Sequence, residues 1–174
     1  MASVAVLMGS DSDLAVMRQA AQVLASFDVP HEVRVLSAHR SPERLAAYVR
    51  AAPERGVRVF VCGAGMAAHL AGAVAAHTGL PVIGVPLSSG PLGGRDALLA
   101  TVQMPSGVPV ATVAVDGAAN AAHLAVRILA LSDPDLAARV ADQRRRMDEQ
   151  AASKDDRLQQ LGPEAYMQAK GADR

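Results

Sequence analysis

Three short polar loops, each placed directly after an apolar run, hold most of the side chains that could do chemistry. They span residues 9–13, 37–42 and 63–70, and together they supply hydroxyls, glycines, a carboxylate, an arginine and two histidines. Hydroxyls, backbone N–H groups beside glycine and a guanidinium bind phosphate, and an imidazole carries protons near neutral pH. The loops therefore predict a site that holds a sugar phosphate and moves a proton beside it.

The first loop has the composition of a phosphate and sugar site. Gly9 permits a tight turn in which backbone N–H groups approach an anion, and Ser10 and Ser12 can donate hydrogen bonds to phosphate oxygens. The carboxylate of Asp13 would repel phosphate but suits the hydroxyls of a ribose. The spacing matches neither a Walker loop nor G-x-G-x-x-G. On this loop alone, a helix cap at Asp11 or Ser12 without any ligand is an equally good interpretation.

The second loop joins a cation to a candidate proton carrier. Arg40 offers a planar fork of donors for phosphate, and Ser37 adds a hydroxyl. His39 lies between them, and an unperturbed imidazole titrates near pH 6.5, which suits general acid–base catalysis. A lone histidine would be better explained as a capping residue on a surface loop. The adjacent arginine and serines, and the position after a strand, favour catalysis.

The third loop is built for close backbone approach. Gly63 and Gly65 leave room for a ligand against the main chain. We expect His69 within the first turn or so of a helix, where the helix dipole favours the neutral imidazole. Such a ring would donate or accept a hydrogen bond without carrying the proton. A histidine packed within the helix is the alternative.

The elements that position these loops alternate along the chain. Apolar runs at residues 4–8, 33–36, 57–62, 81–85 and 109–115 are typical of parallel strands covered on both faces. Helical patterns are expected near residues 14–24, 42–56, 66–78, 96–102 and 117–131. This predicts an α/β fold, a flavodoxin-like three-layer sandwich with a five-stranded parallel sheet in the order 2-1-3-4-5. The three loops then meet at the carboxyl edge of neighbouring strands.

The charge pattern changes beyond residue 132. We predict one nucleotide-binding catalytic domain at residues 1–155 and a C-terminal helical arm at 156–174. Residues 136–150 form a charged helical pattern whose arginine run at 144–146 suits a solvated or intersubunit face, and a short helix is expected near 164–170. Too few apolar residues follow for a second domain, so the arm is expected to lean on a neighbouring subunit.

Composition excludes several classes of protein. The 174 residues are 51% apolar and 20% charged, which is typical of a globular chain, and the formal net charge is zero. Nothing in this balance favours a nucleic-acid or membrane partner. The one cysteine rules out an internal disulfide, and no signal peptide or membrane span is recognisable. We expect a cytoplasmic protein.

The other candidate groups are better explained as structural. Cys62 ends a strand without a base beside it in sequence, which is typical of a buried inert thiol. His31, His77 and His123 lie away from the loops that follow the strands. No group of histidines and carboxylates has metal-ligand spacing, and no cofactor motif is present. We therefore expect neither a metal nor a cofactor.

Four segments together resemble the class I N5-carboxyaminoimidazole ribonucleotide mutase family of purine biosynthesis. They are GSDSD at 9–13, SAHRSP at 37–42, AGMAAHL at 64–70 and DALLATVQMP at 96–105, within a similarity covering residues 4–131. The resemblance implies a homo-octamer of flavodoxin-like subunits. It also implies the reversible conversion of N5-carboxyaminoimidazole ribonucleotide into 4-carboxy-5-aminoimidazole ribonucleotide without metal, ATP or organic cofactor.

The resemblance also implies roles for single residues. Contacts to the ribose phosphate would come from Ser10, Asp13 and Arg40, assisted by Ser37. His39 would be the general acid and base. The pocket for the migrating carboxylate would be lined by the backbone of Ala64 and Gly65 and by His69 and Leu70.

Two positions depart from the family pattern, which commonly has glycine where Met66 stands and proline where Ala71 stands. Two alternative functions stay open. A related class II carboxylase uses free CO2 and tends to carry lysine in place of Arg40 and a different third loop, so Arg40 and His69 favour the mutase. A non-catalytic nucleotide-binding module on the same fold is the second alternative.

Overall fold

The sheet places all its strands in parallel, in the order β2-β1-β3-β4-β5. The computed structural model describes residues 2–172. The strands are β1 (Val4–Met8), β2 (His31–Val35), β3 (Val59–Gly65), β4 (Val82–Leu87) and β5 (Ala111–Thr112). The predicted fold class and strand order are confirmed.

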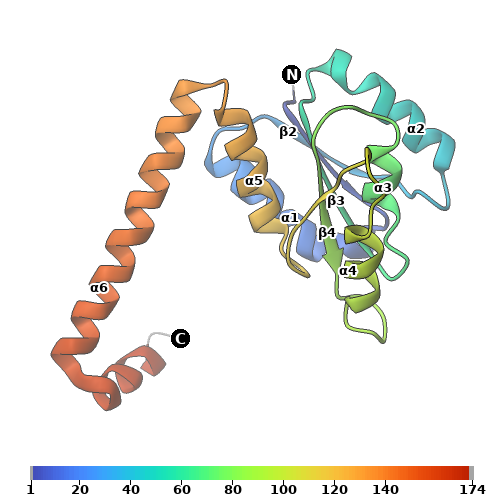
Figure 1. Cartoon of the computed structure of the whole chain (residues 1–174). Coiled ribbons are helices and arrows are strands. Elements are labelled where there is room, and N and C mark those ends of the chain that lie inside the picture. Colours follow the sequence, from blue (N-terminus) through green and yellow to red (C-terminus); the bar gives the residue numbers. More distant parts are fainter. Residues whose placement is uncertain (1, 173–174) are drawn as a thin grey trace.

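Helices cover both faces of this sheet and form the outer layers (Figure 1). They are α1 (Leu14–Ser26), α2 (Pro42–Ala51), α3 (Leu70–Ala75), α4 (Arg95–Val102), α5 (Ala118–Ala130) and α6 (Pro134–Ala172). The short 3-10 turns η1 (Asp11–Asp13) and η2 (Pro53–Arg55) lie between them. Helices α1 and α5 pack together on one face, whereas α2 and α3 cover the other and α4 lies along β4 and β5.

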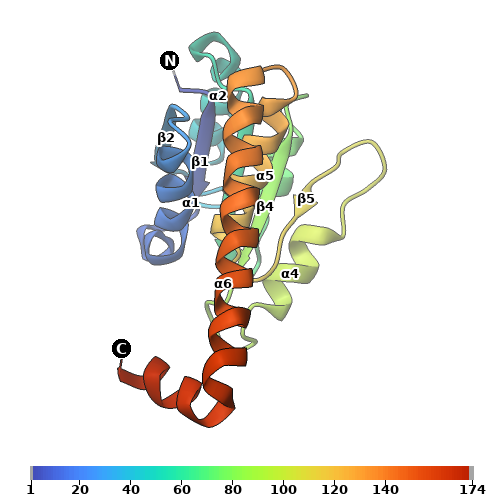
Figure 2. The same cartoon turned by 90° about the vertical axis from the view of Figure 1, so that its left-hand side faces the viewer.

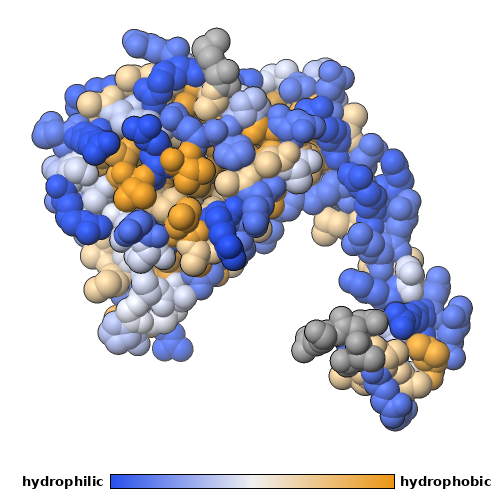
Figure 3. Space-filling view, turned by 180° about the vertical axis from the view of Figure 1, so that it is seen from behind, coloured by the Kyte–Doolittle hydropathy of each residue, from blue (hydrophilic) through white to orange (hydrophobic). Residues whose placement is uncertain are grey.

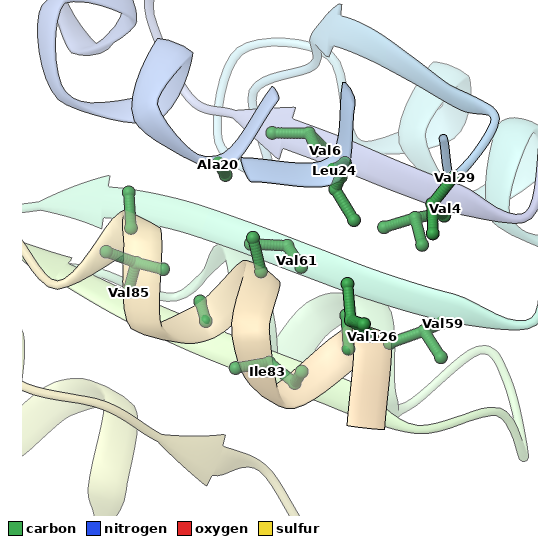
Figure 4. Packing of buried hydrophobic residues seen from close by; sticks show 14 of the residues in the cluster. Val4, Val6, Ala20, Leu24, Val29, Val59, Val61, Ile83, Val85 and Val126 are labelled. Carbon is green, nitrogen blue, oxygen red and sulfur yellow. The ribbon is translucent and has the colours of Figure 1, made fainter. Parts of the chain in front are cut away.

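Two separate hydrophobic clusters hold the layers together, because successive residues of a strand point to opposite faces. Val4 and Val6 of β1 face α1 and α5, where they join Leu24 in the cluster drawn in Figure 4. Ala5 and Leu7 face the opposite side and join the cluster beneath α2 and α3. All five residues of β1 are buried, as expected of a central parallel strand.

The ends of four elements differ from the prediction. Strand β3 continues to Gly65, and α3 begins only at Leu70 because Met66 adopts a left-handed backbone with φ of 55°. Strand β5 keeps only two residues. Strand β2 begins earlier than predicted, at His31, and ends at Val35.

Helix α6 is longer than the charged pattern predicted. The prediction that this helix ends near residue 150 is wrong. The first part of α6 continues to Gly162, where φ of 73° and ψ of 163° produce a kink. A second helical piece follows and contains the short helix expected near residues 164–170. The predicted boundary between residues 155 and 156 lies inside α6, and residues 173–174 of the predicted arm lie outside the described residues.

Most of α6 lies away from the sheet (Figure 1), and its far part extends beyond the body of the molecule (Figure 2). Near its start Leu136 is buried in the cluster of α1 and α5, whereas the far part is exposed. Figure 3 shows this arm as mostly hydrophilic, with hydrophobic side chains gathered at its far end. Exposed apolar residues in and just before α6 include Leu131, Met147, Leu161 and Met167. Within residues 2–172, no helix combines the length and apolarity needed to cross a membrane.

Candidate active site

The carboxyl ends of the central strands enclose a cleft of about 430 Å³. All ten residues predicted for the site line it, namely Ser10, Ser12, Asp13, Ser37, His39, Arg40, Ala64, Gly65, His69 and Leu70. Five further residues complete the wall: Gly9, Ala38, Met66, Ala67 and Ser89. The predicted convergence of three loops is therefore confirmed as geometry. The chemical role of each residue stays a prediction.

The first loop is a rigid turn closed by its own side chains. The Ser10 N–H donates to Asp13 Oδ2 at 3.1 Å, and the Ser12 N–H donates to Ser10 Oγ at 3.4 Å. These bonds form a reciprocal capping box around η1. The cap is therefore Ser10, and the predicted cap at Asp11 or Ser12 is wrong. Because the cap is also part of the cleft wall, capping and ligand binding are not exclusive here.

Burial affects the charge of Asp13. Desolvation raises the pKa of its carboxyl above the ordinary value, against the opposing effects of the Ser10 and Ser12 hydrogen bonds and the charge of Arg40. A carboxylate that is held partly buried at a cleft wall is a common property of binding sites.

Arg40 ties the second loop to the first. One terminal nitrogen of its guanidinium donates to the carbonyl oxygen of Gly9 at 2.8 Å, and its Nε donates to Ser37 Oγ at 3.4 Å. The backbone N–H of Arg40 also donates to Ser37 Oγ, at 3.1 Å. These bonds fix the guanidinium at the cleft wall beside the η1 turn. Its positive charge there suits a phosphate group.

The two predicted histidines meet inside the cleft. Nε2 of His39 lies 2.8 Å from Nδ1 of His69, with the rings edge to face and their centroids 5.0 Å apart. One of these nitrogens must carry a hydrogen and the other must accept it, so the two rings share one proton in this bond. His69 occupies the N-cap position of α3, which agrees with its predicted place within the first helical turn or so. The pair offers proton transfer without any metal.

One residue of the cleft wall was missed by sequence reasoning. Ser89 comes from the loop between β4 and α4, and its Oγ occupies the space that a Cβ on Gly65 would need. The predicted strand order could have indicated this loop, because β4 lies beside β3 and its carboxyl end reaches the same edge of the sheet. The loop was rich in glycine, serine and proline, and nothing in its pattern singled out one serine.

The two departures from the family pattern have different consequences. Met66 holds φ of 55° at the lip of the cleft, a backbone conformation that glycine adopts with less strain. Ala71 lies in the first turn of α3, where a proline would also fit the helix. The first substitution therefore costs local strain, and the second leaves the backbone path unaffected.

The groups interpreted as structural lie outside the cleft lining. Cys62 is buried, and this burial raises the pKa of its thiol, which keeps it protonated. His123 packs edge-on against Phe27, and burial, reinforced by Arg127, lowers its pKa. His31 bonds the carbonyl of Val29 at 2.9 Å. Among the described residues no cluster of three or more histidine, cysteine or acidic side chains could hold a metal ion.

Replacing Asp13 by asparagine should stabilise the fold at pH 7. Because burial raises the Asp13 pKa, the folded state binds the proton more tightly than the unfolded state, and the contribution of Asp13 to stability falls as the pH rises. Asparagine keeps an acceptor for the Ser10 N–H and has no charge to desolvate. Urea unfolding should show an advantage of Asp13→Asn at pH 7 that disappears below about pH 4. The exposed neighbour Asp11→Asn is the control, and an Asp13→Asn variant less stable at pH 7 would contradict the argument.

Comparison with known proteins agrees with this geometry. Residues 3–150 match the family model described as AIR carboxylase. The N5-carboxyaminoimidazole ribonucleotide mutase of Mycobacterium tuberculosis strain H37Rv is 57% identical over 158 residues, which cover 91% of each chain. The phosphoribosylaminoimidazole carboxylase of Schizosaccharomyces pombe is 50% identical over 163 residues, covering 94% of this chain and 30% of that protein.

The fold has close relatives among solved structures. The crystal structure of Treponema denticola PurE superposes with a TM-score of 0.75 at 27% identity, covering 92% of this chain and 98% of the other. The family model covers most of the chain, and the site residues predicted from the resemblance lie together in one cleft. The chain therefore belongs to the AIR carboxylase family.

Proposed function

We propose that this protein is an N5-carboxyaminoimidazole ribonucleotide mutase, an isomerase that reversibly forms 4-carboxy-5-aminoimidazole ribonucleotide in purine biosynthesis. The observation that carries the proposal is the His39–His69 pair, bonded at 2.8 Å in a cleft that also holds Arg40 and the capped serine turn. Relatives of which this chain spans nearly the whole length have this name in bacteria and archaea, and they support the proposal.

In the proposed complex the first two loops hold the ribose phosphate. Ser10 and Ser12 donate hydrogen bonds to phosphate oxygens, and Arg40, held by Gly9 and Ser37, supplies the positive charge. Asp13 accepts hydrogen bonds from the ribose hydroxyls. These contacts place the imidazole base of the nucleotide beside the two histidines, so binding energy orients the reacting atoms.

The proposed reaction moves one CO2 and one proton. Protonation of the exocyclic nitrogen lets its bond to the carboxyl carbon break, which releases CO2 and leaves the neutral amine. The ring carbon C4 then attacks CO2, and the new carbon–carbon bond forms as C4 loses its hydrogen. His39 gives the first proton and takes back the second, while His69 holds the ring of His39 in place. The reaction is redox-neutral, so we propose that no cofactor takes part.

Small residues suit the part of the cleft where CO2 would wait. Ala64, Gly65 and Leu70 line the cleft on the side of β3 and α3 and present few polar side-chain atoms. Apolar walls on that side give CO2 few polar partners and help to keep it within reach of C4. Retaining both fragments replaces a dilute second-order reaction by an intramolecular one.

The substrate of the purified enzyme decides between the mutase and its alternatives. We expect rapid product formation from N5-carboxyaminoimidazole ribonucleotide and far slower formation from aminoimidazole ribonucleotide with bicarbonate. In both reactions the product is measured by its ultraviolet spectrum. Preference for the second pair would identify a carboxylase that uses CO2. Tight binding of either nucleotide with no conversion would identify a non-catalytic binding module.

Replacing His39 by asparagine should abolish turnover while the nucleotide still binds. Asparagine keeps a hydrogen-bonding side chain of similar reach but cannot shuttle a proton, so kcat should fall by about 10²- to 10⁴-fold. The dissociation constant of aminoimidazole ribonucleotide, measured by calorimetry, should change little because the phosphate contacts stay. His77→Asn, on the exposed surface away from the cleft, is the matched control. A near-normal rate in the His39→Asn enzyme would remove His39 from the mechanism.

We also propose that the protein acts in the cytoplasm as a homo-octamer, in which α6 contacts neighbouring subunits. The exposed apolar side chains of Leu161 and Met167 on the far part of α6 support this assembly, since contact with another subunit would remove their apolar area from water. Cell fractionation tests the location.

The assembly makes its own prediction. Sedimentation equilibrium should give a mass eight times that of the chain for the wild type. The double variant Leu161→Glu with Met167→Glu should give smaller species, because burying an unpaired charge at an interface is unfavourable. Gln160→Glu, an exposed polar position on the same helix, should leave the mass unchanged. A wild-type monomer would contradict the octamer.

A further inference from the structure

The loop between β4 and α4 places a hydroxyl group in the cleft wall. Ser89 lines the cleft, and its Oγ lies directly over Gly65, where any Cβ on residue 65 would overlap it. Within residues 2–172 its side chain makes no hydrogen bond, so this hydroxyl has both its donor and its acceptor capacity available. Ser88 and Ser89 are both exposed, but only Ser89 lines the cleft.

Two hydrogen bonds from one residue fix the base of this loop. The backbone N–H of Asp116 donates to the carbonyl of Pro86 at 2.9 Å, and Asp116 Oδ1 accepts from the backbone N–H of Ser88, also at 2.9 Å. Asp116 itself holds a left-handed backbone with φ of 57°. These two hydrogen bonds, called the Asp116 clasp below, restrain the peptide groups on either side of Leu87. They thereby set the position of Ser89. A non-glycine residue kept at positive φ is uncommon and here has a definite geometric use.

We propose that the Ser89 hydroxyl donates a hydrogen bond to the migrating carboxyl group, and that Asp116 is the residue that positions it; this inference rests on the proposed mutase function. The phosphate contacts proposed above lie on the loops after β1 and β2, whereas Ser89 lies against Gly65, on the side of the cleft proposed for CO2. A carboxylate held against small apolar residues needs donors to offset its desolvation, and Ser89 adds one.

The first test compares the adjacent serines. Ser89→Ala should lower kcat/KM for N5-carboxyaminoimidazole ribonucleotide by about 10- to 100-fold, the range for a hydrogen bond to a charged group. It should also release more free aminoimidazole ribonucleotide per turnover, because CO2 is held less well. Binding of aminoimidazole ribonucleotide, which has no carboxyl group, should stay within about twofold, as expected when no contact to that ligand is lost. Ser88→Ala keeps the backbone N–H that the clasp uses and should match the wild type.

The second test separates positioning by Asp116 from general stability. Asp116→Asn and Asp116→Gly both tolerate positive φ, but only asparagine keeps an oxygen that accepts from the Ser88 N–H. We expect Asp116→Asn to retain the wild-type ratio of product to released aminoimidazole ribonucleotide. Asp116→Gly should shift this ratio in the direction of Ser89→Ala, and thermal melting verifies that both variants are folded.

The outcomes distinguish this inference from the function on which it rests. If the wild type converts N5-carboxyaminoimidazole ribonucleotide and Ser89→Ala behaves like Ser88→Ala, the role of Ser89 is wrong and the mutase stands. Equal loss of affinity for both nucleotides in Ser89→Ala would also overturn the inference, since the contact would then not involve the carboxyl group. A wild type without conversion overturns the mutase, and the role of Ser89 with it.

Discussion

The site depends on the parallel pairing of three adjacent strands. In register, Met8 of β1 lies beside Val35 of β2 and Gly63 of β3, so β1 and β2 end at the same level of the sheet and β3 continues two residues further, to Gly65. The loops that follow therefore begin side by side, and two histidines 30 residues apart reach 2.8 Å. Parallel pairing forces this, because each crossover returns the chain to the opposite edge before the next strand begins.

The cleft concentrates local features that the rest of the fold must stabilise. Met66 and Asp116 hold positive φ without being glycine, and burial disfavours the charged form of Asp13. Each of these lowers stability by itself, and such features cluster where a structure is shaped for binding. The capping box of η1 holds Asp13, the Arg40–Gly9 bond joins the second loop to the first, and the hydrogen bonds of Asp116 fix its own position. Rigidity at the cleft is thus supplied by hydrogen bonds within and between loops.

Small side chains decide how the layers approach one another. Helix α5 buries four alanines completely, at positions 118, 121, 122 and 125, and packs closely against α1. Alanine permits short distances between elements but removes little apolar area from water per residue. The long arm α6 holds further apolar groups that the described chain leaves exposed. This combination is the physical basis for expecting contacts between subunits.

Local sequence patterns predicted most residues of the site but not the bounds of every element around it. Apolar runs located the strands, and glycine and polar residues after them located eight of the ten predicted residues that the cleft brings together. The other two, Ala64 and Leu70, came from the family resemblance. The start of α3 was misjudged, since a left-handed Met66 has no sequence pattern of its own. The length of α6 was also missed, because a polar helix without a buried face shows no apolar periodicity, and only the backbone shows that it continues to Gly162.

By itself, the amino-acid sequence determined the class of fold, the order of the strands and the kinds of group at the carboxyl edge. These follow from periodicity and residue type, which act over a few neighbouring positions. Only the tertiary structure decided which of these groups touch: that His39 bonds to His69, that Arg40 reaches Gly9, and that Ser89 covers Gly65. Distances between loops depend on register, twist and crossover length together, and no single segment of sequence contains that information.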